Sequence, residues 1–332
     1  MDSVSGERSW PGAVAVSGGG DSTALMLLAA EWARESGCAK PVVVTVDHGL
    51  APGSNRVAEE VVAKAKRLEL DADVLVWRGR KPVSDIENAA RAARYRLMGS
   101  WCRRHGIGAL YVAHTLEDQA ETFLLRLARG SGVDGLAAMR KVAPFPLRGF
   151  EDLRVVRPLL DVPRGRLRAL LANRGIGWHD DEMNSDSRFA RVRLRAAWPA
   201  LEVAGLSAGR IADAANHLAR ARAALDHSTE MLLAAVSRFE DDHVLVDGAA
   251  LAAAPREIGL RALARMLMQV SARDYRSRFE RLEGLYDAIC SDALAGGRTL
   301  LGCTVKPAPK RRQSFGPRTL LIGPEPRRGR EY

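Results

Sequence analysis

The sequence predicts an α/β protein in which a doubly wound parallel sheet is followed by a smaller, mostly helical domain. Short apolar runs alternate with helix-periodic stretches as far as about residue 170, a pattern typical of parallel strands joined by crossover helices. Beyond residue 207 the apolar residues recur mainly at helical spacing. A Gly-rich turn separates the first apolar run from the first helical stretch, and open α/β sheets bind ligands at such turns.

The elements of the first part are expected to alternate. Buried strands are predicted at residues 13–16, 41–46, 73–77, 109–113 and 155–160, and helices over residues 25–32, 54–68, 85–105, 117–129 and 164–173. Three strands lead directly into polar residues, namely residues 17–22, Asp47 and His114. Because the carboxyl ends of parallel strands meet along one edge, these groups are expected to converge on one crevice. Residues 177–195 are polar and show no clear periodicity.

The second part is expected to begin with one long amphipathic helix. Ile211, Leu218, Leu225, Leu232 and Phe239 recur every seven residues, which predicts about nine turns at roughly 3.6 residues each. Two more helices are predicted at residues 255–271 and 277–294, with strand-like pieces near 299–305 and 319–322 and a frayed basic tail from 324.

The composition indicates a folded protein with no membrane span and a preference for anionic partners. A hydrophobic content of 47% is enough for a real core. The net charge of +10 favours a polyanionic partner such as nucleic acid, although a coding bias toward arginine explains part of the excess. No apolar run reaches membrane-spanning length, no export signal is visible, and the four cysteines are scattered, so we expect a cytoplasmic location with reduced thiols. No membrane association or protein partner is predicted.

Residues 17–22, which we call the glycine loop, form the strongest motif. They lie between a strand and a helix, where backbone N–H groups and the positive helix end attract phosphate. A carboxylate at Asp21 makes sense beside phosphates mainly if Mg²⁺ lies between them. The Walker and dinucleotide-binding spacings are absent. The loop resembles that of the N-type ATP pyrophosphatases, with an ordinary Gly-rich turn as the alternative. The ATP-binding candidates are Ser17, Gly18, Gly19, Gly20, Asp21 and Ser22.

Two further groups of residues are candidates for a functional role, and each also has an ordinary structural explanation. Asp47 and His48 follow a strand end, where a plain turn is the alternative. Glu87, Arg91 and Arg94 are spaced to share one helix face, where a solvated charged face is the alternative.

Two more groups lie further along the chain. His114 ends a strand, and Asp118 and Glu121 begin the next helix, where acids also suit the helix dipole. A run of arginines near Phe189 and Trp198 is typical of phosphate contact with base stacking, or of a solvated surface. These tRNA-contact candidates are Arg188, Arg191, Arg193 and Arg195.

The combination resembles one family, the tRNA(Ile)-lysidine synthases. The resemblance covers about residues 13–200 through SGGGDS, VDHGL, the E-N-x-x-R-x-x-R-Y helix, HTLEDQAET with RLARGSG, and R-P-L-L. Met183 and Val192 stand where the family usually has polar side chains, and Glu117 where it usually has Asp. The resemblance implies an ATP pyrophosphatase domain at residues 1–200 and a tRNA-binding accessory domain at 201–332.

The resemblance also implies a reaction. ATP adenylates C2–O of the wobble cytidine in the isoleucine tRNA with a CAU anticodon, pyrophosphate leaves, and the amine of L-lysine displaces AMP. ATP and Mg²⁺ are the expected cofactors, and Asp21 is the expected metal ligand. The implied catalytic residues are Asp21, Asp118, Arg91 and Arg94, with His114, Glu121 and Asp47 as lysine-binding or supporting residues.

Two alternatives remain at this stage. Another tRNA-modifying enzyme of the same superfamily, such as a thiolase, shares the glycine loop, but no cysteine lies beside SGGGDS or HTLEDQAET. A catalytically silent tRNA-binding protein is the second alternative, and the presence of Asp21, Asp118 and both loop serines argues against it.

Overall fold

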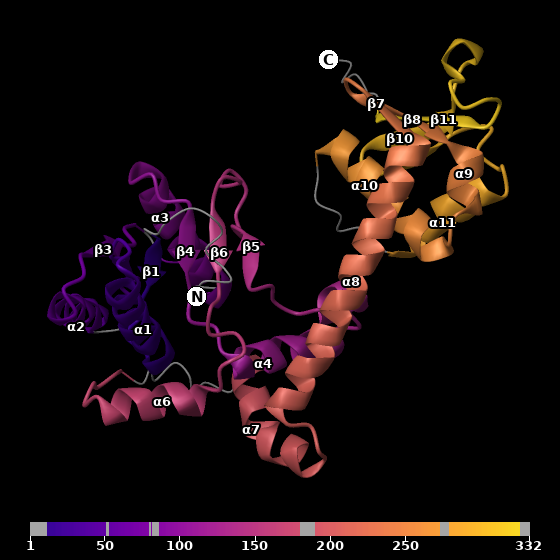
Figure 1. Ribbon diagram of the computed structural model, residues 1–332. Helices are drawn as coiled ribbons and strands as arrows, with labels where there is room; N and C mark the ends of the chain where they lie inside the picture. The colour runs from indigo at the N-terminus through magenta and orange to yellow at the C-terminus, as the bar shows by residue number, and fades with distance from the viewer. Residues whose placement is uncertain are drawn as a thin grey trace. The chain divides into compact units, whose positions relative to one another are not determined.

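The computed structural model describes residues 12–50, 53–79, 81, 86–179, 190–272 and 279–325, with the backbone alone for residues 86, 87 and 279. The chain divides into two compact units, residues 1–219 and residues 220–332. The helix α8 (Ala208–Val236) crosses the boundary between them (Figure 1). Among the described residues, no helix combines the length and the apolar character needed to cross a bilayer.

The first unit is built on one six-stranded sheet. Its strands are β1 (Ala13–Ala15), β2 (Val42–Asp47), β3 (Ala72–Val76), β4 (Ala109–Tyr111), β5 (Val142–Pro144) and β6 (Arg154–Val156). The strand order is β3-β2-β1-β4-β6-β5, and every neighbouring pair is parallel except β5 with β6. The chain order reverses between β1 and β4, which lie side by side. A ligand crevice is expected beyond the carboxyl ends of these two strands.

Helices cover both faces of this sheet (Figure 1). The helices of the first unit are α1 (Gly20–Ser36), α2 (Ser54–Arg67), α3 (Ile86–Arg104), α4 (Leu116–Leu127), α5 (Val133–Leu136), α6 (Arg164–Asn173) and α7 (Ala190–Val203). One core joins α1, α2 and α6 to the sheet through Leu25, Val61 and Leu171. A second core packs α3 on the opposite face through Met98 and Trp101. The doubly wound parallel sheet predicted from the alternating pattern is therefore confirmed.

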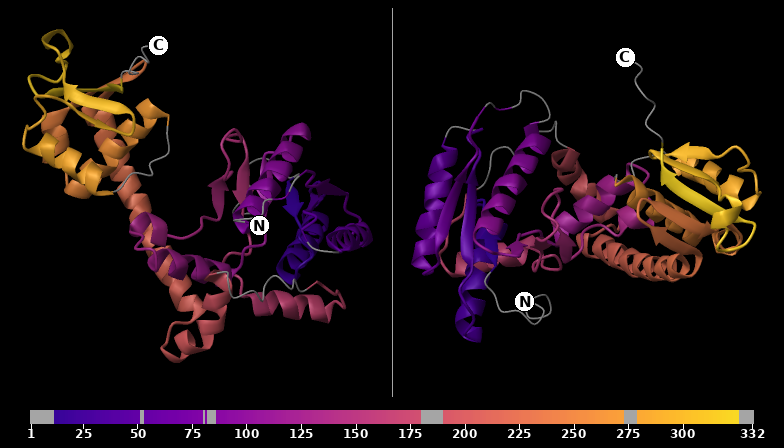
Figure 2. Two further views of the ribbon diagram at one scale, coloured as in Figure 1. Left: turned by 180° about the vertical axis from the view of Figure 1, so that it is seen from behind. Right: turned by 90° about the horizontal axis from the view of Figure 1, so that it is seen from above.

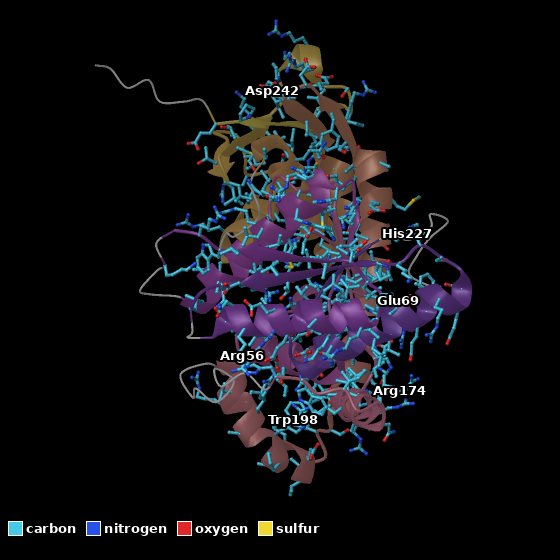
Figure 3. The ribbon with its side chains drawn as sticks, turned by 90° about the vertical axis from the view of Figure 1, so that its left-hand side faces the viewer. Arg56, Glu69, Arg174, Trp198, His227 and Asp242 are labelled. Atoms are coloured by element: carbon cyan, nitrogen blue, oxygen red, sulfur yellow. The ribbon has the colours of Figure 1, made fainter. Side chains whose placement is uncertain are left out.

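The ion pair between Arg174 and Glu31 links the end of α6 to α1 at 2.7 Å, and Figure 3 shows Arg174 at the surface of this unit. The apolar side chains of Leu167 and Leu171 pack in the same core as residues of α1 and also hold α6 in place. This packing fixes the start of α6, which supplies a functional side chain described below.

Several elements of the first unit differ from the predicted ones. The strand predicted at residues 155–160 is β6, which ends at Val156, and the helix predicted at residues 25–32 is longer, as α1. The strand β5 and the helix α5 were not predicted, because elements of three and four residues are too short to show a period. The helix α7 begins at Ala190, inside the stretch predicted to lack periodicity. Its arginines at alternate positions and its internal Pro199 hide the helical pattern of apolar residues.

The second unit packs helices against an antiparallel sheet. Its strands are β7 (Ser237–Glu240), β8 (His243–Asp247), β9 (Arg298–Leu300), β10 (Cys303–Pro307) and β11 (Thr319–Pro324), and its helices are α9 (Gly248–Ala253), α10 (Arg256–Ser271) and α11 (Phe279–Cys290). The sheet order is β7-β8-β11-β10-β9. Its inner face packs on the helices, as Figure 2 shows from two sides. The packed residues include Val244, Val246 and Ile322 of the sheet and Leu263 of α10.

The long helix predicted from the seven-residue spacing ends three residues before Phe239. The helix stops at Val236, and Phe239 lies in β7, which turns into β8. The heptad spacing continues into this strand by coincidence. The second unit therefore contains more strand than the helical pattern indicates, with the two predicted strand-like pieces forming part of its sheet.

Candidate active site

The glycine loop connects β1 to α1, and its last three residues form the first turn of the helix. Gly19 precedes the helix in an extended conformation and contributes no capping side chain. Ser22 Oγ accepts a hydrogen bond from Ser17 N at 3.1 Å and donates one to Gly19 O at 2.9 Å. Gly18 has φ +88°, and a Cβ there would lie 2.6 Å from Cγ1 of Val57. Only glycine fits this position, and the first turn of α1 faces its ligand without a side-chain cap.

Asp21 lies in the first turn of α1 and has two unequal oxygens. Oδ2 accepts a hydrogen bond from Arg164 Nε at 2.9 Å. Oδ1 is buried and has no hydrogen-bond partner among the described residues. Burial raises the pKa of the Asp21 carboxyl, and the Arg164 guanidinium opposes that rise. Because an unpaired buried oxygen is costly, Oδ1 is suited to a cation or a donor that arrives with the ligand.

Asp118 lies at the start of α4, and its two carboxylate oxygens have different partners. Oδ2 accepts hydrogen bonds from Thr115 N at 2.8 Å and Thr115 Oγ1 at 3.0 Å, which is the capping role considered above. Oδ1 accepts from Arg164 Nη2 at 3.2 Å. Although burial alone would raise the pKa of Asp118, Arg164 and the Thr115 hydrogen bonds hold it below its usual value. The carboxylate is therefore ionised.

Glu121 lies one turn further along α4, where it is only 1% exposed. It pairs in bidentate geometry with Arg195 of α7, Nε to Oε1 at 2.6 Å and Nη2 to Oε2 at 3.3 Å. Arg195 Nη2 is also 4.0 Å from Asp118 Oδ1. We call Asp21, Asp118, Glu121, Arg164 and Arg195 the carboxylate cluster. With three acids and two arginines, it retains one negative charge.

His114 follows β4 and contacts Arg157, which follows β6. Arg157 Nε donates to His114 Nδ1 at 3.2 Å. Because a guanidinium is always a donor, Nδ1 must carry the lone pair and the neutral ring must carry its proton on Nε2. Burial, with the charges of Arg157, Arg91 and Arg191, lowers the pKa of His114 to about 3 against the opposing charge of Asp118. His114 therefore stays neutral near physiological pH and offers a donor at Nε2.

A pH-dependent loss of stability is expected from His114. Its folded pKa lies below its unfolded value, so the unfolded chain binds the extra proton and stability falls as the pH drops below the unfolded pKa. Between about pH 7 and about pH 5 the wild type should lose roughly 2 kcal/mol more than His114→Asn, whose amide oxygen can still accept from Arg157. Urea unfolding followed by tryptophan fluorescence measures this, since all six tryptophans lie in residues 1–219. Parallel pH profiles would contradict it.

The arginines of α3 and α7 are placed as follows. Arg91 lies over the Tyr95 ring, 5.1 Å from its centroid, and Arg94 is exposed one turn further along α3. On α7, the charge of Arg191 acts on His114, whereas Arg193 is exposed. The predicted run of four arginines is therefore divided, with Arg195 in the carboxylate cluster and Arg188 outside the described residues. Trp198, on the same helix in Figure 3, donates to Glu202 at 3.2 Å.

Asp47 and Glu117 organise the backbone around the crevice. Asp47 Oδ1 accepts hydrogen bonds from Gly49 N at 3.0 Å and Ser54 Oγ at 2.6 Å, which shapes the entry to α2. Glu117 accepts from the backbone N–H of Arg164 at 2.9 and 3.1 Å. The glutamate that stands where the family usually has Asp thus ties the start of α6 to α4.

The donor set suits a divalent cation that binds together with a phosphate ligand. The orphaned Oδ1 of Asp21 and the nearby Oδ1 of Asp118 are the hard oxygen ligands that Mg²⁺ prefers. The described residues contain no group of three or more acidic, His or Cys side chains that could hold a metal by themselves. Two protein carboxylates with substrate phosphates completing the shell are typical of Mg²⁺ sites.

Sequence reasoning missed Arg164, which links the two carboxylates. Arg164 lies 143 residues from Asp21 and 46 from Asp118, and it follows Pro163 at an ordinary helix start. Among many arginines, no spacing distinguishes it from a solvated residue. Only the packing of α6 against α1 brings it to the site.

Comparisons with known proteins agree with the resemblance. The PP-loop domain family matches residues 6–201. A tRNA(Ile)-lysidine synthase of Methylobacterium nodulans is 43% identical over 88% of this chain and 84% of its own length, and one of Wolbachia pipientis wMel is 34% identical over 93% and 70%. The solved U34-tRNA thiolase NcsA from Methanococcus maripaludis has a TM-score of 0.51 at 16% identity, covering 63% of this chain and 72% of its own. That likeness shows the fold alone.

Proposed function

This chain belongs to the family of tRNA(Ile)-lysidine synthases, and we propose that it joins L-lysine to C2 of the wobble cytidine in the isoleucine tRNA with a CAU anticodon. The reaction uses ATP and releases AMP and pyrophosphate. The proposal rests on one observation: Arg164 contacts both Asp21, in the glycine loop, and Asp118, at the start of α4. A helix end suited to phosphate and two carboxylates suited to a metal ion therefore lie together. Because tRNA, lysine and ATP are all found in the cytoplasm, we propose that the protein acts there.

In the first step the C2 oxygen of the cytidine attacks the α-phosphorus of ATP, and the bond to pyrophosphate breaks. The glycine loop and the start of α1 would bind the departing phosphates. Mg²⁺ held by Asp21 and Asp118 would supply charge neutralisation there. Arg91 and Arg94, on α3, would offset charge on the phosphates or on the adenylated base. The contact with Arg157 leaves Nε2–H of His114 as a donor, which would bind a polar atom of either substrate.

In the second step the lysine amine attacks C2, the C2–O bond breaks and AMP leaves. The residual negative charge of the carboxylate cluster favours binding of the ammonium form of lysine. The lowered pKa of Asp118 makes it a good counterion but a weak base, so the ammonium must lose a proton to water before the neutral amine attacks C2, and the proton released as the C–N bond forms also passes to water. His114 is not the acceptor of this proton, because Nε2 already carries one and Nδ1 faces Arg157.

A thiolase activity is less well supported. Thiolases of this superfamily need nucleophilic or cluster-binding cysteines. Cys102 is a residue of α3 that is buried in the core, and burial raises the pKa of its thiol to about 12. Cys38 follows α1 at the end remote from the glycine loop. Neither is suited to donate or carry sulfur at the crevice.

The tRNA partner would also be bound by the second unit. Four strands place one residue each in a row across this sheet, in the order Arg238, Leu245, Leu321 and Lys306. The two leucines belong to a small cluster separate from the core that packs on the helices. Arg238 and Lys306 are exposed and flank this apolar centre, which Ala308 and Phe315 cover. The exposed 3₁₀ turn Lys310–Arg312 follows β10 directly. A cationic surface of this kind fits an RNA backbone.

Replacing Lys310, Arg311 and Arg312 together with alanine should weaken tRNA binding and reduce its salt dependence. The slope of log Kd against log salt is expected to fall by roughly one for each phosphate that the variant no longer neutralises. Filter binding over a salt series measures it, with ATP binding as the internal control. The matched variant Lys66→Ala/Arg67→Ala on the exposed side of α2 should keep the wild-type slope. An unchanged slope in the triple variant would refute a role of this turn.

The deciding experiment measures pyrophosphate release from ATP with and without L-lysine and unmodified isoleucine tRNA, followed by mass analysis of the nucleosides. Lysine incorporated into a cytidine supports the proposal. Release that needs tRNA but gives another product would indicate a different tRNA-modifying enzyme. No turnover in the presence of Mg²⁺ would favour a silent tRNA-binding protein.

A further inference from the structure

Arg164 occupies a position that the proposed reaction does not explain. Its guanidinium spans the two carboxylates that face the phosphate site, with Nε on Asp21 Oδ2 at 2.9 Å and Nη2 on Asp118 Oδ1 at 3.2 Å. The two acids come from different helices, α1 and α4, and a single guanidinium contacts both. Asp118 and Asp21 repel each other, which adds to the raised pKa of Asp21. Without Arg164, Asp21 would lose its hydrogen-bonded cation, and Asp118 would keep only Arg195, 4.0 Å away.

The backbone of Arg164 is anchored independently of its side chain. Its N–H donates to both oxygens of Glu117, and Pro163 precedes it with φ −62°. The base of the side chain is therefore fixed to α4, the helix that carries Asp118. The long, flexible arginine side chain can leave the carboxylates without any change in the backbone.

We propose that Arg164 is a built-in counterion that keeps free Mg²⁺ away from Asp21 and Asp118 until a nucleotide arrives. The inference rests on the proposed function, because it concerns the same ATP site. With Arg164 in place, the carboxylate cluster has one net negative charge, which is too little to attract a hydrated divalent ion strongly in competition with a bonded guanidinium. The polyphosphate brings the additional negative charge that holds both cations. Binding of the metal therefore depends on binding of the nucleotide.

This role predicts a gain of Mg²⁺ binding when Arg164 is removed. In Arg164→Ala, free Mg²⁺ should bind the vacated carboxylates at least about tenfold more tightly than in the wild type, which corresponds to about 1.4 kcal/mol. The readout is the shift of the unfolding temperature by millimolar MgCl₂ without nucleotide, relative to NaCl of equal ionic strength. Tryptophan fluorescence reports the first unit alone, since residues 220–332 contain no Trp.

Two controls test the assignment to these side chains. Arg166→Ala removes an exposed positive charge from the same helix and should show the wild-type response to Mg²⁺. Arg164→Ala/Asp21→Asn should lose the gained response, because one ligand is gone. Arg164→Gln, which keeps polar contacts but not the charge, provides the same test if the alanine variant does not fold.

The proposal is supported if MgCl₂ clearly raises the unfolding temperature of Arg164→Ala or Arg164→Gln and raises that of the wild type and of Arg166→Ala only slightly. An equal shift in the wild type, or no shift in a folded Arg164 variant, overturns it. The measurement needs no tRNA and no lysine. A chain that makes a product other than lysidine can therefore still pass this test, and a true lysidine synthase can still fail it.

Discussion

Replacing Asp21 with Asn should remove ATP-dependent pyrophosphate release while leaving the first unit folded. The substitution keeps the shape of the side chain and its contact with Arg164 but removes the charge at the orphaned Oδ1. The loss of rate is expected to be about a thousandfold or more, at the upper end of what removal of one preorganised electrostatic group costs. Initial rates with saturating tRNA and lysine measure it.

Stability should change little in this variant, by about 1 kcal/mol or less, because burial already disfavours the charged form of Asp21. Asp71→Asn, an exposed position in the same unit, is the matched control and should retain full activity. Wild-type pyrophosphate release from Asp21→Asn would mean that the nucleotide does not bind at the glycine loop.

The glycine loop and the ends of the strands could be predicted because each signal is local. Gly18, Asp21, Asp47 and His114 all follow buried strands, and parallel pairing brings these strand ends to one edge. The strand order, with β1 beside β4, was not predicted, because the right-handed crossover rule and the chain order leave several orders open. Periodicity therefore predicted the parallel sheet of the first unit.

The partners of these residues could not be predicted from local signals. Arg164 and Arg195 are two arginines among many, and each meets its acid across α6 or α7. The pairing of Arg157 with His114, which decides the protonation of the histidine, likewise depends on β6 lying beside β4. Composition supplies the charges, but only tertiary packing decides which acid each arginine neutralises.

Breaking the pair between Glu121 and Arg195 should cost the first unit about 3 kcal/mol. Arg195→Leu leaves the carboxylate of Glu121, 1% exposed, without a cation. The value is the low end of the range for a broken buried pair, because the Arg195 side chain is itself 35% exposed and water can reach the vacated position. Urea unfolding followed by tryptophan fluorescence measures the loss in the first unit.

The double variant Glu121→Leu/Arg195→Leu separates the contribution of this ion pair to stability from its effect on lysine binding. Removing both charges should recover most of the stability, since an apolar pair replaces the ion pair between α4 and α7. Arg195 also lies 4.0 Å from Asp118, so its removal leaves Asp118 less well positioned for lysine. We therefore expect the double variant to be stable but to have a KM for lysine raised at least about tenfold, with the KM for ATP little changed. A lysine KM that recovers together with stability would mean that the pair serves only to hold α4 to α7.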